Sequence, residues 1–280
     1  MPMLPESPRS HDSTPPQDDS LDPFKDALRA RYPLDAVVRG AARRRTARRV
    51  VGGSILSVAA ALMVWHADPA YRVDTLATAV GEHRQWPLAD GSRLVLNTGS
   101  SARVEWRVRS RRMRVEQGEV SIEIAHSPFR PFVTRAGDVT IHDIGTSFTV
   151  RRDAQDVRVG VVSGAVEVAV AQRPAVMLHP EQSVVVKGDR IGALQPFDPA
   201  ATLSWREGRL VFDGTPLSVA IAEIRRYRRA PVELDSRAAN LRLSGQFNTD
   251  NVDTLLDMLP GVLPLNVKRD ADGTVTIAHR

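Results

Sequence analysis

The sequence predicts a mainly β protein: one transmembrane helix, then an antiparallel all-β domain, then a small α+β domain. Three observations lead to this prediction. Residues 50–67 contain no Asp, Glu, Lys or Arg. Between residues 72 and 195, apolar and polar residues alternate with a period of two, and turn residues recur at short intervals. Between residues 205 and 280, apolar residues recur at helical spacing between short strand-like runs.

The composition excludes several classes of protein. Of the 280 residues, 42% are hydrophobic, which is enough to form a core and excludes a wholly disordered chain. The chain has no cysteine, which excludes disulfides, cysteine-ligated zinc, iron–sulfur clusters and a thiol nucleophile. The formal net charge of +5 suits nucleic-acid binding only if the basic residues gather on one accessible surface.

Residues 1–49 are predicted to form a short cytoplasmic region. Residues 1–20 contain five prolines and few large apolar side chains, so we expect them to be disordered. Residues 22–32 are predicted to form a helix, with Asp22 as its N-cap and Pro23 at its first position. The apolar stripe of this helix consists of Phe24, Ala27, Leu28 and Tyr32.

Residues 50–67 are predicted to form the transmembrane helix. At about 1.5 Å per residue this stretch spans roughly 27 Å, close to the hydrocarbon thickness of a bilayer. Six arginines and no acidic residue lie between residues 39 and 49, whereas Asp68 and Asp74 outnumber Arg72 after the stretch. The positive-inside rule therefore places the N-terminus in the cytoplasm and the chain after about residue 70 outside it.

Other interpretations of this stretch remain open. A cleaved signal peptide normally has a short charged start, and neither Trp65-His66-Ala67 nor Asp68-Pro69-Ala70 forms a suitable cleavage site. A buried helix of a soluble domain is compatible with Gly52 and Gly53. The arginine run alone would suit nucleic acid, and paired arginines before an apolar stretch also suit twin-arginine export.

Residues 72–195 are predicted to form ten or more short antiparallel strands, because no helical crossover, as a parallel sheet requires, is present. The clearest runs are 93–96, 103–108, 120–124, 139–141, 147–150, 157–159 and 166–168. An arginine cluster in this region mostly alternates with apolar residues, so we expect it to form the solvent face of a hairpin rather than a nucleic-acid site. Its members are Arg103, Arg107, Arg109, Arg111, Arg112 and Arg114.

Residues 205–280 are predicted to form the α+β domain. The first helix carries Leu217, Ala220, Ile221, Ile224 and Tyr227 on one face. Asp250 or Asn251 caps the second, which ends at Pro260-Gly261. The predicted strands are 210–212, 232–234, 241–247, 265–268 and 274–277.

Several motifs in order resemble the FecR family of membrane-anchored sigma-factor regulators, over residues 77–259. They are Gly81-Glu82, Leu88 to Ser92, Leu96 to Ser100, Arg112 with Gly118-Glu119-Val120, Arg130 to Val133, Gly145 to Val150, Gly164 to Val168, and Trp205 to Gly208 with Leu210, Phe212, Pro216-Leu217 and Arg226-Tyr227. The C-terminal domain resembles the short domain shared by secretins and TonB-dependent transducers, most clearly at Ser244-Gly245-Gln246-Phe247.

The resemblance implies a single-pass inner-membrane regulator of the anti-sigma type, with its C-terminal region in the periplasm. Such a protein relays a signal from an outer-membrane TonB-dependent transducer to an extracytoplasmic-function sigma factor, as in cell-surface signalling for iron-siderophore uptake. Membrane proteases carry out the regulated proteolysis. An alternative is a periplasmic structural or polymer-binding module of a secretion or envelope system, because the C-terminal domain also resembles parts of secretion pores.

The resemblance and the strand pattern together suggest partner-binding residues. On the transducer side, an exposed edge strand can accept a partner's strand, although internal pairing of the same strands is the alternative. The candidates there are Leu241, Ser244, Gly245, Gln246, Phe247, Thr274 and Ile277. On the sigma side, relatives carry a longer helical domain with tryptophans, whereas residues 1–49 offer only a short stripe. Its candidates are Phe24, Leu28 and Tyr32.

We predict no ordinary enzyme activity, no cofactor and no metal site, because no nucleotide-binding or catalytic motif is present and the histidines are scattered. Some FecR relatives break their own backbone at the bond that corresponds to Gly145-Thr146. Such a break is an N-to-O acyl shift, in which the threonine hydroxyl attacks the preceding carbonyl. His142 and Asp143 are neighbouring candidate bases. The alternative is that Gly145-Thr146 simply starts a strand.

Overall fold

The computed structural model of this chain describes residues 22–31, 57–143, 145–154 and 156–280. The chain divides into two compact units, residues 1–66 and residues 67–280, which we treat separately. Residues 1–20, predicted to be disordered, lie outside the described residues, as do Tyr32 and residues 50–56.

The first unit contains helix α1 (Asp22–Arg31), at the position predicted from the Asp22-Pro23 start. Residues 57–67, the described part of the predicted transmembrane stretch, are helical. Their large apolar side chains are exposed: Val58, Leu62, Met63, Val64 and Trp65. Within the described part of the chain, no helix has both the length and the apolar character needed to cross a membrane.

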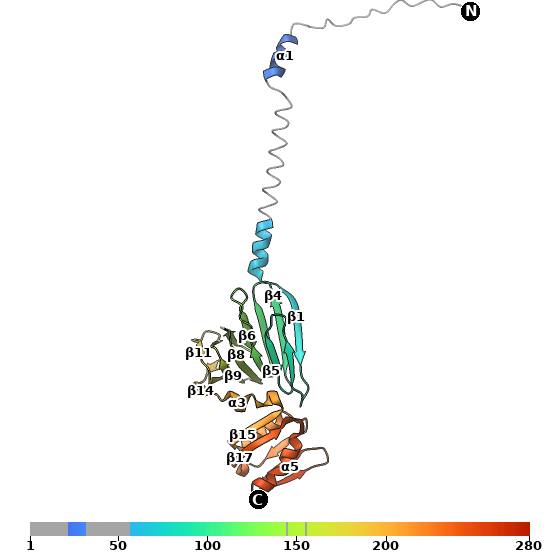
Figure 1. Ribbon diagram of the computed structural model, residues 1–280, viewed down its shortest axis with the longest axis vertical. Helices are drawn as coiled ribbons and strands as arrows, with labels where there is room; N and C mark the ends of the chain where they lie inside the picture. Colours follow the sequence, from blue (N-terminus) through green and yellow to red (C-terminus); the bar gives the residue numbers. More distant parts are fainter. Residues whose placement is uncertain (1–21, 32–56, 144, 155) are drawn as a thin grey trace, which may run out of the picture. The chain divides into compact units, whose positions relative to one another are not determined.

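The second unit begins with a 14-stranded sheet, which confirms the mainly β prediction (Figure 1). Alternating residues of its strands are buried, as the period of two predicts. The strands are β1 (Ala70–Ala77), β2 (Arg84–Pro87), β3 (Arg93–Leu96), β4 (Ser101–Arg107), β5 (Arg111–Glu123), β6 (Phe132–Ala136), β7 (Val139–Asp143), β8 (Ser147–Asp153), β9 (Asp156–Ser163), β10 (Val166–Val170), β11 (Val176–Leu178), β12 (Gln182–Lys187), β13 (Arg190–Ile191) and β14 (Gln195–Pro196).

Strand β5 joins the two halves of this sheet. Its first residues pair with β4 and β6, and its last residues pair with β3 and β8. Gly118, with φ +80°, lies where the pairing changes, and a Cβ there would lie 2.2 Å from Ser100 Oγ. The two halves enclose one hydrophobic core, to which Leu94, Val104 and Phe148 contribute fully buried side chains.

The prediction that all strands of this region pair antiparallel is wrong at one place. Residues 111–115 of β5 pair in parallel with residues 132–136 of β6. A parallel pair needs a crossover, and here the crossover contains no helix. The second half of β5 and the loop 124–131 supply it instead, so the long strand itself makes the parallel connection.

Arg111 also differs from its predicted place on the solvent face, because only 2% of it is exposed. Its guanidinium pairs with Asp90, donates to the backbone carbonyls of Ala125 (3.1 Å) and Arg130 (3.0 Å), and lies 5.4 Å from the ring of Phe132. Arg111 stands two residues before buried Met113, so the period of two already placed it inward. It organises the loop 124–131.

The rest of the second unit is the α+β region, with its own hydrophobic core. Its β-sheets have the orders β15-β17 and β16-β19-β18, and the pair β16–β19 is parallel. The elements are α3 (Pro199–Thr202), η2 (Ser204–Glu207), β15 (Arg209–Pro216), α4 (Leu217–Arg225), β16 (Val232–Leu234), η3 (Ser236–Ala238), β17 (Arg242–Asn248), η4 (Thr249–Asn251), α5 (Val252–Val262), β18 (Leu265–Arg269) and β19 (Val275–His279).

The two predicted helices of this region form as α4 and α5. Asn251 caps α5, since its side chain accepts a hydrogen bond from the backbone N–H of Thr254. The predicted end of α5 at Pro260-Gly261 is two residues early. The N–H of Leu263 still bonds to the carbonyl of Leu259 at 2.9 Å, which completes the last turn past the proline.

Candidate functional site

The peptide bond between Gly145 and Thr146 lies in the turn between β7 and β8. Gly145 is exposed and has φ +85°, a left-handed conformation that favours glycine. Thr146 is buried, and its hydroxyl donates a hydrogen bond to the carboxylate of Asp143. The carbonyl of Thr146 accepts from the N–H of Ile124 at 3.1 Å, which ties the turn to the end of β5.

Two further residues, His126 and Gly164, lie against this turn. A Cβ on Gly145 would lie 3.2 Å from Nδ1 of His126, so the exposed His126 ring stands beside this residue. A Cβ on Gly164 would lie 2.4 Å from Cγ2 of Thr146 and 2.9 Å from the carbonyl oxygen of Gly145. Glycine at position 164 is therefore what allows the β9–β10 turn to approach the peptide bond so closely.

Of the two predicted bases, the structure brings Asp143 to the hydroxyl. His142 lies in β7, where its backbone pairs with Val133 and Glu167 and its side chain is exposed. The contact of His126 with this turn was not predicted. No sequence signal could have revealed it, because His126 reaches Gly145 only through the path of the loop 124–131.

The arrangement contains the parts of an N-to-O acyl shift. The hydroxyl oxygen of Thr146 would attack the carbonyl carbon of Gly145, while Asp143 takes the hydroxyl proton as general base. The C–N bond would then break as Asp143 passes the proton to the threonine nitrogen, which would become a free amine, and an ester would join Gly145 to the Thr146 side chain. Hydrolysis of this ester by water would leave two chains, one ending in the carboxyl group of Gly145 and the other beginning with the amine of Thr146.

A second constellation joins the β-sheet region to helix α4 and the turn after it. The Tyr227 hydroxyl donates to Oδ1 of Asn97 at 2.9 Å, and Nδ2 of Asn97 donates to Glu119 at 2.9 Å. Glu119 also pairs with Arg226 at 2.8 Å. Arg226 pairs in turn with Glu223, which accepts from Arg151 of β8 at 2.6 Å. We call these six residues the α4 network.

The α4 network is largely buried, and its charges hold one another in place. Burial disfavours ionisation of Glu223, but Arg226 and Arg151 outweigh it and hold the pKa of this carboxyl below its ordinary value. Burial likewise opposes the charge of Arg226, yet Glu119 and Glu223 raise the pKa of its guanidinium. Burial raises the pKa of the Tyr227 hydroxyl, so Tyr227 stays a neutral donor. The network therefore fixes the α+β region to the sheet.

The predicted transducer-side residues divide into two groups. Strand β17, which carries Ser244 to Phe247, pairs with β15 on one side and with no other described strand. Its second edge therefore has no partner among the described strands. The ring of Phe247 packs against Phe212 with centroids 6.0 Å apart, and Gln246 is exposed.

The other predicted edge strand, residues 274–277, does not lie at a sheet edge. Strand β19 lies in the middle of its sheet, with β16 on one side and β18 on the other. Ile277 is fully buried, and Thr274 lies in the turn before the strand. The period-two pattern identified a strand here but could not show that two neighbours pair with it.

On the predicted sigma side, Phe24 and Leu28 lie one turn apart on α1, and both are exposed. They form an apolar stripe on the helix, as the spacing predicts. The third predicted residue, Tyr32, lies outside the described residues.

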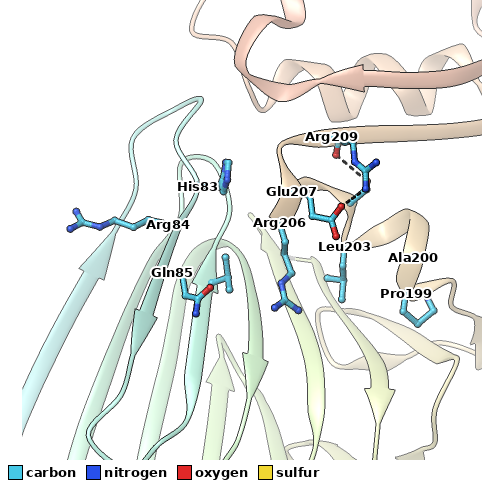
Figure 2. Close-up of a pocket in the computed structure, with 11 residues that line it drawn as sticks. His83, Arg84, Gln85, Pro199, Ala200, Leu203, Arg206, Glu207 and Arg209 are labelled. Atoms are coloured by element: carbon cyan, nitrogen blue, oxygen red, sulfur yellow. Dashed lines mark hydrogen bonds and ion pairs between the residues drawn. The ribbon is translucent and has the colours of Figure 1, made fainter.

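A cavity of about 720 Å³ lies between β2 and the segment from α3 to β15. Figure 2 shows His83 and Gln85 on one side and Arg206, Glu207 and Arg209 on the other. Arg206 pairs with Glu123 at 3.0 Å, Arg209 pairs with Glu207, and Arg84 stacks on Trp86. The described residues contain no group of three or more side chains arranged to hold a metal.

Comparison with known proteins gives a family match and a structural likeness. Two crystal structures of a "putative anti-sigma factor" from Parabacteroides distasonis ATCC 8503 each superpose with a TM-score of 0.63 at 22% identity. They cover 75% and 74% of this chain, and this chain covers 100% and 99% of theirs. At this identity the likeness shows a shared fold. No curated protein matches the chain.

The family model that matches is described as FecR protein, and it matches residues 74–167. This segment runs from β1 to β10 and includes the Gly145-Thr146 turn, Asn97 and Glu119. The resemblance to FecR predicted from the ordered motifs is therefore confirmed over residues 74–167, about a third of the chain.

Proposed function

We propose that this protein is a single-pass inner-membrane regulator of the anti-sigma type, which relays a periplasmic signal to an extracytoplasmic-function sigma factor. The FecR match over residues 74–167 and the fold shared with the "putative anti-sigma factor" from Parabacteroides distasonis support this role. One structural observation carries the relay: the α4 network couples the α+β region to the FecR-type sheet through buried, mutually paired charges.

Residues 50–67 are the proposed membrane anchor. The described part, 57–67, is helical, and its large apolar side chains are exposed, which is the arrangement expected of a segment solvated by lipid. The six arginines between residues 39 and 49 support an orientation with the N-terminal region in the cytoplasm and the sheet region in the periplasm.

The open edge of β17 is the proposed receptor site for the signalling domain of a TonB-dependent outer-membrane transducer. A partner strand would add main-chain hydrogen bonds to this edge, and the exposed Gln246 would help to select it. Because β15, the neighbour of β17, leads directly into α4, binding at this edge would act on the element that carries the α4 network.

Self-cleavage at Gly145-Thr146 is the proposed processing step, with membrane proteases acting afterwards. The hydrogen bond from the Thr146 hydroxyl to Asp143 and the left-handed Gly145 support it. A break there would separate the FecR-type sheet into two chains that meet at β5 and β8.

The sigma partner is tested with the full-length chain. Phe24→Ala combined with Leu28→Ala removes the α1 stripe, and we expect co-purification of the cognate sigma factor from membranes to fall at least tenfold, which corresponds to about 1.4 kcal/mol or more of binding free energy. Asp26→Ala, on the opposite face of α1, is the matched control and should leave co-purification unchanged. Equal recovery with both variants would show that α1 does not hold the sigma factor.

A further inference from the structure

Three exposed apolar side chains and one partly buried arginine lie near the residues that directly follow the helical segment 57–67. Asp68, the next residue, is buried, and its carboxylate accepts hydrogen bonds from the N–H of Arg109 (2.7 Å) and the hydroxyl of Ser110. The N–H of Val108 bonds to the carbonyl of Pro69 at 3.3 Å. The β4–β5 turn is therefore fixed beside the first residues after the helix.

The loop 124–131 is brought to the same place. The guanidinium of Arg130 donates to the carbonyl of Arg107 and to the hydroxyl of Tyr71 at 3.1 Å, and it lies 5.8 Å from the centre of the Tyr71 ring. Phe129, directly before Arg130, is 89% exposed. Tyr71 and Val108 are 63% and 40% exposed. We call Tyr71, Val108, Phe129 and Arg130 the junction rim.

The junction rim combines features that suit a lipid head-group layer. Phenylalanine and tyrosine gain from burial at the boundary of the acyl chains, and tyrosine keeps its hydroxyl in water. Arg130 contacts a hydroxyl and a carbonyl but no carboxylate among the described residues, so its positive charge remains available to a lipid phosphate.

The rim is also close to the helix along the chain. Tyr71 is four residues after residue 67, which is a reach of at most about 14 Å. The helical segment exposes Val58, Leu62 and Met63, which need an apolar surrounding. One bilayer would account for both exposed surfaces, because its interior would surround the helix and its head-group layer would contact the rim. A protein partner at the rim would leave the exposed side chains of the helix unexplained.

We propose that the junction rim rests on the bilayer from which the helix emerges, with Phe129 and Tyr71 in the head-group layer and Arg130 at a lipid phosphate. This inference rests on the proposed membrane anchor. It goes beyond anchoring, because it assigns the folded unit a contact surface of its own and fixes the end of the sheet that faces the membrane.

The absence of cysteine allows a direct test. Phe129→Cys in the full-length chain carries a nitroxide spin label, and the chain is reconstituted in vesicles that contain anionic phospholipid. Met258→Cys in α5, at a site of similar chemistry that is 54% exposed, is the control. At position 129 we expect a shift towards high collision rates with oxygen, which partitions into lipid, and low rates with a water-soluble nickel complex. At position 258 the nickel complex should collide freely.

The outcomes separate the inference from the proposed function. If the chain fails to float with the vesicles, the anchor itself is wrong. If it floats but the label at 129 is as accessible to the nickel complex as the label at 258, the rim does not touch lipid and the inference is overturned. A label at 129 shielded from both reagents would mean a protein contact and would also overturn it. Val108→Cys provides a second position with the same expectation.

Discussion

The hydroxyl of Tyr227 donates a 2.9 Å hydrogen bond to the side-chain carbonyl oxygen of Asn97, and so joins two residues 130 positions apart in the chain. Tyr227 follows helix α4, and Asn97 follows strand β3 of the 14-stranded sheet. The same Asn97 oxygen also accepts from the N–H of Thr98 at 2.7 Å. The bond between Tyr227 and Asn97 joins the two uncharged members of the α4 network.

Removing the hydroxyl of Tyr227 should weaken the attachment of the α+β region to the sheet, but it leaves Asn97 with another hydrogen-bond partner. We expect Tyr227→Phe to lower the free energy of unfolding by about 0.5–1.5 kcal/mol, because Asn97 keeps its bond to Thr98. Urea unfolding of the full-length chain in detergent measures it. Tyr71→Phe, which removes an exposed hydroxyl that accepts a hydrogen bond from Arg130, is the control and should change this free energy by less than about 0.5 kcal/mol. Equal effects would show that the buried bond contributes nothing specific.

The ion pairs of Glu223 should make stability depend on pH. Since Arg226 and Arg151 lower the pKa of folded Glu223 below 4.5, its stabilising contribution is complete above that value and is lost as the pH falls through the lowered pKa. We expect Glu223→Gln to cost about 1–3 kcal/mol near pH 7, and progressively less as the pH falls below 4.5 and the wild-type carboxyl takes up its proton. Urea unfolding of both proteins across this range measures the difference. A cost that does not change with pH would contradict the ion-pair interpretation.

The proposed self-cleavage predicts that substitutions at Thr146 and Asp143 change whether, or how fast, the Gly145-Thr146 bond breaks. Thr146→Ala should leave the purified full-length chain as one band, whereas the wild type should yield two fragments that part between residues 145 and 146. Thr146→Ser keeps a hydroxyl and should still cleave, and Asp143→Asn should slow the reaction because it removes the base. Thr149→Ala, at a buried threonine that bonds to the Val120 carbonyl, should cleave normally. Denaturing gels and mass spectrometry of the fragments decide it; an uncleaved wild type would contradict the proposal.

Two glycines with positive φ should respond very differently to alanine. At Gly118 a Cβ would lie 2.2 Å from Ser100 Oγ and 2.6 Å from Ser100 Cα, so we expect Gly118→Ala to cost more than about 4 kcal/mol. At Gly188, with φ +58°, no heavy atom lies within 4 Å, so Gly188→Ala should cost only the conformational strain of about 1–2 kcal/mol. Chemical unfolding of the two variants measures both. Similar losses of unfolding free energy in the two variants would mean that the backbone at Ser100 moves to make room for the new Cβ.

Much of the fold could be predicted from the sequence, because period and turn residues are local. Alternation identified the strands around Val104 and Phe148, and helical spacing identified α4 and α5. Pairing was harder. The parallel pair β5–β6 and the central place of β19 depend on which strands meet, and that is decided by packing between segments far apart in the chain.

The site could be predicted in part for the same reason. Gly145, Thr146 and Asp143 are sequence neighbours, and the structure keeps them together. His126 reaches the turn through a loop whose path Arg111 sets, and the sequence carries no sign of that path. Tyr227 was expected on the inner face of its helix, but its bond to Asn97 exists only because two separately predicted regions pack against each other.

The position of Gly145-Thr146 in the sheet has a mechanical consequence. A break there would leave β1 to β7 on one chain and β8 onward on the other. Strand β8 would still pair with β5 of the first chain along residues 118–123, and β10 would still pair with β7. The product would therefore be a two-chain complex held by interleaved strands rather than by a covalent bond. Such a complex would stay assembled at rest but would come apart under sustained tension, so a pull on the C-terminal region would separate it from the chain that carries β1 to β7.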